Sequence, residues 1–371
     1  MRDAPKFEIF LSAPPGLELA LKAEALERGF KKAKAVPGGV SFRGKWPDVW
    51  RANLELRGAG RVLVRLGGFR ATHFSALDHG ARSFDWARVL RPDVPVKVEV
   101  SCKGSKLYHE RAVAERVERA LVEEFGVQIR SDNALKLMVR IEADEVMFSV
   151  DTSGDLLHKR GYKEAVGKAP MRETLAALLL RQCGYSGCEP VLDPMCGSGT
   201  FPIEAAEIAA GLMPGRARTF AFEQLVGFDP VAWNALRQRP PIPLPDLQFY
   251  GSDRDAGAIR SAIANAERAG VAALTRFDCH SVSDTLRPDG PPGLVMINPP
   301  YGGRIGDKKQ LFGLYASLGK TLVERFSGWR VGLVTTDAGL ARATNLPFGP
   351  PGPPVSHGGL KINLWQTKAL R

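Results

Sequence analysis

Cysteine is scarce in this chain, and its few cysteines lack the spacing of a metal site. Five occur in 371 residues. Cys183 and Cys188 lie five positions apart, but neither a second such pair nor a His-x3-5-His motif follows, as a zinc site would require. An odd number of cysteines without this pattern indicates a reduced, cytoplasmic protein, and we expect no metal centre.

Long apolar runs are also missing. No stretch reaches the roughly 18 apolar residues that a transmembrane helix needs. Charged residues interrupt the apolar stretch within positions 1–16, unlike in a signal peptide. Hydrophobic residues make up 44% and charged residues 25% of the chain, a composition that excludes a disordered or fibrous protein. At about 150 residues per domain the length predicts two or three domains, and we expect a monomer that does not bind membranes.

Positive charge, by contrast, is in excess. The chain has 51 Lys and Arg residues against 40 Asp and Glu, a net charge of +11. Residues 31–70 contain ten basic and two acidic residues, which accounts for most of the surplus. Such a segment attracts polyanions, most commonly nucleic acid, although a solvated basic surface explains the charge equally well. The side chains in it that we expect to contact RNA are Lys31, Lys32, Arg43, Arg61 and Arg65.

The first third of the chain alternates short strands with helices. Residues 6–13 are typical of a strand, residues 16–28 of a helix, and residues 36–42 of a hairpin through Pro-Gly-Gly. Alternating valines predict a strand at 94–100, an amphipathic helix follows at 108–125, and two more strands come after it. We interpret this part as an α+β module that is too short to contain a catalytic sheet.

After residue 168 the pattern is that of an α/β protein. Apolar strands are predicted at 190–192, 248–250, 293–297 and 329–335, and helical segments separate them. This alternation predicts a doubly wound parallel sheet of the Rossmann type. A domain boundary should lie between residues 151 and 168, and the site should lie at the carboxyl ends of the strands.

A glycine loop, DPMCGSGT, follows the first of these strands. Gly197 and Gly199 permit a tight strand-to-helix turn and the close approach of a ligand to the backbone. No lysine follows Gly199, and the third glycine of a dinucleotide fingerprint is missing near Phe201, so neither a P-loop nor that fingerprint fits. The carboxylate of Asp193 suits a ligand with an ammonium group, such as the methionine part of S-adenosylmethionine. A purely structural glycine turn is the alternative.

Acidic residues follow at the next two strands. Asp253 is placed to accept hydrogen bonds from ribose hydroxyls, and Asp255 to cap the helix after it. The distance from the glycine loop exceeds the usual ~20 residues, so an insertion at about 211–247 must intervene. Asp278 stands where a third strand should end, and it can accept a hydrogen bond from an adenine amino group. A role outside the site explains Asp278 equally well.

The most specific motif is Asn298-Pro299-Pro300-Tyr301, directly after an apolar strand. Two consecutive prolines continue neither a helix nor a central strand, so they fix the chain where it leaves the sheet. An exocyclic base amine is a poor nucleophile because its lone pair is conjugated into the ring. The Asn298 side-chain oxygen and the Pro299 carbonyl can accept its N–H groups, and Tyr301 can stack on the base. Positioning the amine against a methyl sulfonium then supplies the rate without a metal.

Together these motifs resemble the THUMP-domain RNA guanine-N2-methyltransferases, above all bacterial members that act on large-subunit rRNA. The similarity extends over essentially the whole chain. It rests on GLELALKAEALERG, GVSFRG, SGDLLHKRGY, KAPMRETLAA, DPMCGSGTFPIEAA, GSD and NPPYGGRIG. The resemblance implies a ferredoxin-like domain at 1–60, a THUMP RNA-binding domain at 61–153 and an S-adenosylmethionine-dependent methyltransferase domain at 154–371.

The resemblance also implies roles for individual residues. The motif at 298–301, including Pro300, would handle the target amine. A basic cluster at the domain junction, His158, Lys159 and Arg160, would contact RNA phosphates, although a solvated linker explains it equally well. The expected cofactor-binding residues are Lys168, Arg172, Asp193, Pro194, Cys196, Gly197, Ser198, Gly199, Thr200, Asp253 and Asp278.

The leading hypothesis is an enzyme that transfers a methyl group from S-adenosylmethionine to the N2 amine of a guanosine in 23S rRNA. A tRNA guanine-N2-methyltransferase is the second hypothesis, since THUMP modules commonly recognise tRNA ends. A DNA amino-methyltransferase is the third, and the THUMP-like N-terminal part argues against it. The fourth is a non-catalytic RNA-binding or ribosome-assembly factor, which the intact Asp193, Asn298 and Tyr301 disfavour.

Overall fold

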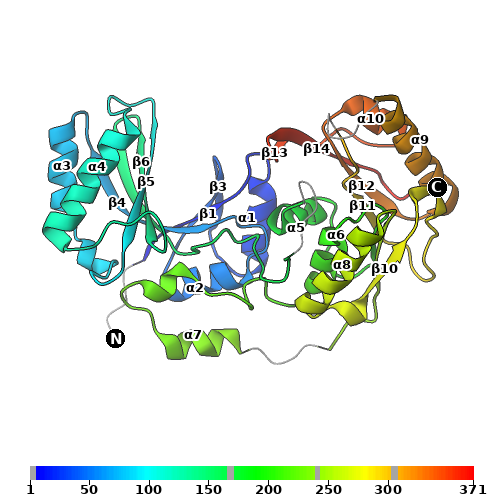
Figure 1. The fold of residues 1–371 in the computed structure, drawn as a ribbon, viewed down its shortest axis with the longest axis horizontal. Helices are drawn as coiled ribbons and strands as arrows, with labels where there is room; N and C mark the ends of the chain where they lie inside the picture. Colours follow the sequence, from blue (N-terminus) through cyan, green and yellow to red (C-terminus); the bar gives the residue numbers. More distant parts are fainter. Residues whose placement is uncertain (1–5, 165–170, 239–242, 302–307) are drawn as a thin grey trace. The chain divides into compact units, whose positions relative to one another are not determined.

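The computed structural model describes residues 6–164, 171–238, 243–301 and 308–371 (Figure 1). The chain divides into two compact units and passes between them several times along its length. Unit 1 comprises Met1–Ser12, Ala25–Leu157 and Arg218–Arg239. Unit 2 comprises Ala13–Glu24, His158–Ala217 and Pro240–Arg371.

Unit 1 is built on one seven-stranded sheet with the order β2-β3-β1-β4-β7-β6-β5. Its neighbouring strands are antiparallel except for the parallel pair of β5 and β6. Strand β1 pairs with β3 on one side and with β4 on the other. One continuous sheet therefore contains strands from both sides of residue 60, where a domain boundary is expected. The strands are β1 (Phe7–Ser12), β2 (Lys34–Val36), β3 (Gly39–Gly44), β4 (Val62–Arg70), β5 (Val96–Lys103), β6 (Leu135–Glu142) and β7 (Glu145–Asp151).

Helices α3 and α4 lie side by side against the β4–β6 part of this sheet (Figure 1). Strand β6 shows why one face is covered: Leu137, Val139 and Ile141 are buried, whereas Arg140 between them is exposed. This alternation is that of a sheet with one face on a core and one toward water. The helices formed in the N-terminal part of the sequence are α1 (Glu18–Glu27), α2 (Trp46–Glu55), α3 (Phe74–Arg82) and α4 (Glu110–Ala120), with short helical turns at Trp86–Arg88 and Leu121–Phe125.

The insertion predicted at about 211–247 is present, but its middle part belongs to unit 1. It contains a helical turn at Ala221–Gln224 and helix α7 (Pro230–Arg237). Phe222 is buried, and its ring centroid lies 5.0 Å from that of Trp233 and 6.2 Å from that of Trp50. The Phe222 amide also donates to the Thr152 carbonyl at 3.0 Å. The insertion therefore completes the core of unit 1.

Unit 2 contains the predicted doubly wound sheet, which is confirmed, with the order β10-β9-β8-β11-β12-β14-β13. The first five strands of this order are parallel, and β14 pairs antiparallel with β12 and with β13. The strands are β8 (Val191–Asp193), β9 (Phe249–Asp253), β10 (Thr275–Cys279), β11 (Leu294–Ile297), β12 (Arg330–Thr335), β13 (Val355–His357) and β14 (Leu360–Gln366).

Strands β8 and β11 are buried along their whole length, as expected of parallel strands with helices on both faces. Among the described residues, no helix combines the length and the apolar composition needed to cross a bilayer. The helices of this part are α5 (Glu173–Gln182), α6 (Thr200–Ala209), α8 (Ala256–Ala269), α9 (Lys308–Arg325) and α10 (Ala338–Ala343), with helical turns at Ala272–Leu274 and Val282–Asp284.

The packing of the insertion predicts a stability effect. Phe222→Ala removes a fully buried ring from unit 1 and should lower its free energy of unfolding by about 3–5 kcal/mol. The matched control is Val231→Ala on helix α7, where the side chain is 78% exposed and the expected change is within about 0.5 kcal/mol. Urea unfolding followed by circular dichroism measures both. Equal effects of the two substitutions would contradict the packing role of the insertion.

Candidate active site

The two sequence motifs meet at the point where the strand order reverses. The glycine loop follows β8, and Asn298 follows β11. These strands are neighbours in the sheet, with Val295 opposite Leu192. In open α/β sheets, ligands bind in the crevice that forms beyond the carboxyl ends of the strands at such a switch point. The structure thus brings the two motifs to one edge.

The two glycines of the loop serve different purposes. Both have positive φ angles, 53° at Gly197 and 83° at Gly199. A Cβ atom at Gly199 would lie 3.1 Å from Phe277 and from Ile203, so packing requires glycine there. At Gly197 no described atom lies within 4 Å of a Cβ position. The backbone at Gly197 therefore faces open space and can be approached by a ligand.

Asp193, the last residue of β8, is a buried carboxylate with unused acceptor capacity. It is 2% exposed, and its Oδ1 accepts a hydrogen bond from the Met195 amide at 3.0 Å. Burial raises the pKa of Asp193 well above its usual value, and the nearby charge of Asp253 adds to this. No basic partner lies beside it among the described residues. A buried carboxylate without a cation is costly, so the site fits a positively charged ligand group.

Asp253 braces the glycine loop from the neighbouring strand. Its Oδ2 accepts a hydrogen bond from the Gly197 amide and its Oδ1 one from the Asp255 amide, both at 3.0 Å. Asp255 caps helix α8 as predicted, with its Oδ1 accepting from the Gly257 amide at 2.7 Å. Each carboxylate oxygen of Asp253 retains a second lone pair, and ribose binding by Asp253 stays a prediction.

The rest of the loop is held by its surroundings. The Cys196 amide donates to the Ser252 carbonyl at 2.9 Å, and the Ser198 carbonyl accepts from the Asn265 side chain at 3.0 Å. Pro194 is buried, and burial raises the pKa of the Cys196 thiol well above its usual value. A raised pKa favours the thiol over the nucleophilic thiolate, and cofactor binding by Cys196 stays a prediction.

Asp278 is less clearly part of the site. It lies within β10, opposite Ser252 of β9, and its side chain is 48% exposed. Its Oδ2 pairs with the Arg276 guanidinium at 3.1 Å, a surface ion pair of small energy. Phe277, which sequence reasoning did not identify, reaches the loop instead: a Cβ atom at Gly199 would lie 3.1 Å from its ring. Adenine recognition by Asp278 stays a prediction.

At the end of β11 the side-chain oxygen of Asn298 is buried and has no hydrogen-bond partner among the described residues. An unpaired buried acceptor costs about 1–3 kcal/mol, so a donor from a ligand would relieve it. Pro299 is buried and Pro300 half-buried. Tyr301 is only 7% exposed, so stacking of a base on its ring stays a prediction that requires the ring face to open.

Lys163 is a residue of this site that sequence reasoning missed. Its Nζ donates to the Thr200 hydroxyl at 2.8 Å and to the Met171 carbonyl at 3.1 Å, and it pairs with Glu173 at 3.2 Å. The Lys163 and Glu173 side chains are 9% and 3% exposed. Lys163 thus links the start of α5 to the start of α6. It lies just after the basic cluster at 158–160, which was the only signal.

Two other predicted cofactor residues, Lys168 and Arg172, lie between Lys163 and Glu173 in the sequence. Arg172 immediately precedes helix α5, and its side chain is exposed. Lys168 lies outside the described residues. Among the residues that the structure describes, no group of three His, Cys, Asp or Glu side chains has the arrangement of a metal site.

The basic cluster at the domain junction requires a correction. Arg160 is 3% exposed and pairs with the buried Glu204 of α6 at 3.3 Å, so it is not a surface contact for RNA. Burial, with Arg172 and Arg160 nearby, lowers the pKa of His158 to about 4, so at neutral pH this side chain carries no positive charge. Only Lys159 of the three is exposed.

Two of the predicted RNA contacts in unit 1 are also corrected. Arg61 pairs with the buried Asp151 and donates to the Gly154 carbonyl. Arg65 pairs with Glu8 at 2.7 Å and lies over the Phe10 ring. These pairs use part of each guanidinium, and the side chains are only 20% exposed for Arg61 and 28% for Arg65. Of the five predicted contacts in this segment, Lys31, Lys32 and Arg43 are exposed.

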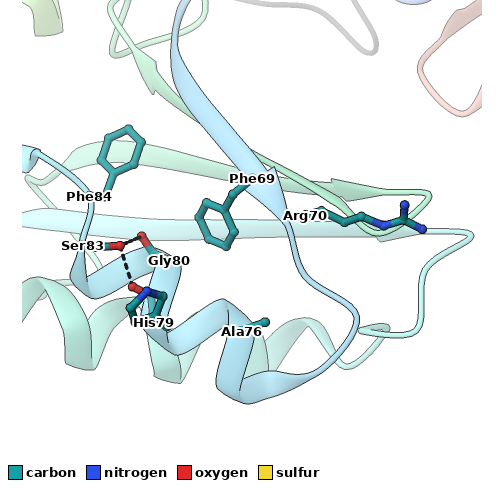
Figure 2. Close-up of a pocket in the computed structure, with 7 residues that line it drawn as sticks. All are labelled: Phe69, Arg70, Ala76, His79, Gly80, Ser83 and Phe84. Carbon is teal, nitrogen blue, oxygen red and sulfur yellow. Dashed lines mark hydrogen bonds between the residues drawn. The ribbon is translucent and has the colours of Figure 1, made fainter.

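Unit 1 also has a shallow cavity of about 370 Å³ between β4 and α3. Figure 2 shows the Phe69 ring pointing from β4 toward α3, while Arg70 points away from it. A Cβ atom at Gly80 would lie 2.3 Å from the Phe69 ring, so glycine is needed for this approach. The lining contains no carboxylate, and its Ser83 hydroxyl donates to the His79 carbonyl at 2.8 Å. Its lining residues are Phe69, Arg70, Ala76, His79, Gly80, Ser83 and Phe84.

Two family models match the chain. The model of the RMKL-like methyltransferase domain matches residues 160–347, and the model of the RlmL ferredoxin-like domain matches residues 8–63. These matches confirm the predicted fold class of a ferredoxin-like region followed by a methyltransferase sheet.

Individual relatives agree with this. The ribosomal RNA large subunit methyltransferase K/L of Methylococcus capsulatus is 35% identical over 352 residues, which are 90% of this chain and 47% of that protein. The chain thus spans about half the length of this curated relative. SMU.472, a protein assigned as a methyltransferase and crystallised with SAH, matches with a TM-score of 0.89 and 27% identity over 100% of both chains. A possible methylase from Clostridium difficile 630 matches with a TM-score of 0.89 and 30% identity over 99% of both chains.

The Lys163 link predicts a stability effect. Lys163→Met leaves Glu173 buried without its cation and should lower the free energy of unfolding by about 3–5 kcal/mol. Replacing both partners, in Lys163→Met/Glu173→Leu, should recover most of this loss because no uncompensated charge remains. Urea unfolding of the three proteins, wild type included, measures the effect. A double variant as unstable as Lys163→Met would show that the pair is not the cause.

Proposed function

The chain belongs to the family of RMKL-like methyltransferase domains, and we propose that it transfers a methyl group from S-adenosylmethionine to the N2 amine of a guanosine in 23S rRNA. The observation that carries this proposal is the buried, unpaired side-chain oxygen of Asn298 at the switch point of the sheet. It is an acceptor without a donor, next to the loop that contains the buried carboxylate of Asp193.

The residues present fit the cofactor. The unused acceptors of Asp193 suit the ammonium of its methionine part, and Gly197 leaves the backbone open to it. When bound, S-adenosylmethionine supplies an electrophilic methyl group on a sulfonium. The SAH-bound relative described above supports this choice of cofactor. The residues that would hold it are Lys168, Arg172, Asp193, Pro194, Cys196, Gly197, Ser198, Gly199, Thr200, Asp253 and Asp278.

Asn298 would orient the target amine. Its side-chain oxygen and the Pro299 carbonyl would accept the two N–H groups, so the nitrogen lone pair faces the methyl donor and not the solvent. Holding a reactant in this way supplies much of the rate of such a transfer, because no strong acid, base or metal is needed. Tyr301 would stack on the guanine once its ring face is accessible.

We assign the RNA substrate to the whole chain. The curated relative acts on large-subunit rRNA by its name, and unit 1 presents Lys31, Lys32 and Arg43 to solvent. We propose a ferredoxin-like domain at 1–60, a THUMP RNA-binding domain at 61–153 and the methyltransferase domain at 154–371. An enzyme with this substrate works in the cytoplasm.

Nucleoside mass mapping tests this function. The purified chain is incubated with S-adenosylmethionine and with unmodified 23S rRNA or unmodified tRNA, and the digested nucleosides are analysed. We expect N2-methylguanosine in the rRNA sample. The same product in tRNA alone would assign the enzyme to tRNA, and no methylated guanosine in either would overturn the proposal.

The chemical step gives a prediction at Asn298. Asn298→Ala should reduce the single-turnover rate by about 10² or more, because the amine loses its orienting acceptor. Calorimetry should show nearly unchanged cofactor affinity. Stability should not fall, since the substitution removes an unpaired buried oxygen. A variant that transfers methyl groups at the wild-type rate would disprove this role, and one that merely unfolds would show that Asn298 is structural.

RNA binding gives a second prediction. The triple variant Lys31→Gln/Lys32→Gln/Arg43→Gln should bind RNA more weakly and reduce the slope of log K against log salt by up to about 0.7–0.9 per lost phosphate contact. Lys320→Gln/Lys361→Gln/Lys368→Gln removes three exposed cations from the methyltransferase part and serves as the control. Filter binding at several salt concentrations measures both slopes. An unchanged slope for the triple variant would mean that these cations are only solvated surface.

A further inference from the structure

Tyr315 connects helix α9 to the end of β11. Its side chain is fully buried. Its hydroxyl oxygen lies 3.3 Å from the Pro300 carbonyl oxygen and 3.3 Å from the Thr335 hydroxyl oxygen. Thr335, the last residue of β12, is also fully buried and accepts a hydrogen bond from the Asp337 amide at 3.3 Å. These contacts join the ends of two neighbouring strands, β11 and β12, through one phenol.

The Tyr315 hydroxyl is the donor in both of these contacts. The Pro300 carbonyl oxygen and the Thr335 hydroxyl oxygen both accept from it, so its single hydrogen is shared between them. The Thr335 oxygen also accepts from the Asp337 amide. Burial raises the pKa of Tyr315, so the phenol keeps its proton at neutral pH. The phenol thus donates toward the end of each strand, and Thr335 competes with Pro300 for its hydrogen.

The Pro300 carbonyl is important for holding the backbone of this motif, because two consecutive prolines, Pro299 and Pro300, have no backbone N–H groups. The backbone of these two residues can therefore form hydrogen bonds only through its carbonyl oxygens. A hydrogen bond to the Pro300 oxygen orients the peptide plane between Pro300 and Tyr301. Because proline φ angles are fixed, this hold extends back to Asn298.

We propose that Tyr315 is a positioning residue for methyl transfer, whose hydroxyl holds the Pro300 carbonyl and so sets Asn298 and Tyr301 toward the target amine. This inference rests on the proposed function, in which Asn298 and Tyr301 handle the guanine. Tyr315 itself does not touch the substrate. A structural role alone would need only the ring, which fills the space below the motif.

Tyr315→Phe tests the hydroxyl and keeps the ring. We expect the single-turnover rate to fall by about tenfold, the upper end of what a neutral hydrogen bond contributes. Cofactor affinity and the KM for RNA should stay within about twofold, because the acceptor groups themselves remain. The melting temperature should fall by about 2–4 °C at most.

Tyr185→Phe is the matched control. Tyr185 is another buried tyrosine of unit 2, and its hydroxyl donates to the Ala205 carbonyl of α6 at 2.8 Å. Its loss should lower the melting temperature by a similar amount without lowering the rate per folded molecule. If Tyr315→Phe and Tyr185→Phe reduce the rate equally, or if Tyr315→Phe keeps the wild-type rate, the positioning role of Tyr315 is overturned.

Thr335→Val provides a second test. It removes the acceptor that shares the Tyr315 hydrogen and leaves Tyr315 able to donate to Pro300, so the rate should not fall by more than about twofold. Tyr315→Phe/Thr335→Val should be about as slow as Tyr315→Phe, because the phenol hydrogen is already absent in the single variant. A Thr335→Val variant as slow as Tyr315→Phe would show that the contact with Thr335, and not the one with Pro300, affects the rate, and would overturn the proposal.

The rate of Asn298→Ala distinguishes a failure of the proposed function from a failure of the positioning role of Tyr315. If Asn298→Ala is severely slowed while Tyr315→Phe is not, the proposed function holds and the positioning role fails. If Asn298→Ala transfers methyl groups at the wild-type rate, the proposed chemistry at this motif fails, and any slowing by Tyr315→Phe must have another cause.

Discussion

The reversal of strand order between β8 and β11 is the constraint on which the site depends. Both strands are buried along their length and run in parallel, so both must leave the sheet at the same crowded edge. The chain leaves the two strands in different ways. After β8 it turns through glycines with positive φ, and the N–H groups of Gly197 and Gly199 bond to Asp253 and to the Cys196 carbonyl. After β11 it leaves through two prolines, which have no N–H group. The first exit is therefore fixed by its own hydrogen bonds, whereas the Pro299 and Pro300 backbone at the second can only accept.

The treatment of buried polar groups supports a ligand at this edge. Elsewhere in unit 2 buried carboxylates have basic partners: Glu173 pairs with Lys163, and Glu207 of α6 pairs with Arg216. Among the described residues, Asp193 has no such partner and the side-chain oxygen of Asn298 has no donor. These acceptors lie at the ends of two neighbouring strands, where a bound ligand can supply the missing donors.

Local patterns in the sequence were sufficient for the strands, the glycine loop and the Asp255 cap, because each depends on residues close together in the chain. These patterns could not predict which residues far apart in the sequence pair with each other. Arg160 stands in a polar segment typical of a surface, and only its pairing with Glu204 of α6 buries it. The same holds for Lys163 with Thr200, and for Phe222, which lies within the methyltransferase part of the sequence but packs in unit 1. Pairings of this kind depend on how the chain folds and produce no periodic pattern in the sequence.

Long-range pairing also changes the interpretation of the basic segment at residues 31–70. Its arginines are largely occupied, with Arg61 on Asp151 and Arg65 on Glu8, because a guanidinium forms several directed hydrogen bonds at once. Its lysines stay at the surface, and Lys34 on the edge strand β2 also discourages pairing of that edge with another chain. Contacts of lysines with phosphates attract RNA but do not read its sequence. In the proposed function, the choice of guanine therefore falls to the acceptors at the strand ends of unit 2, which can match the donor edge of that base.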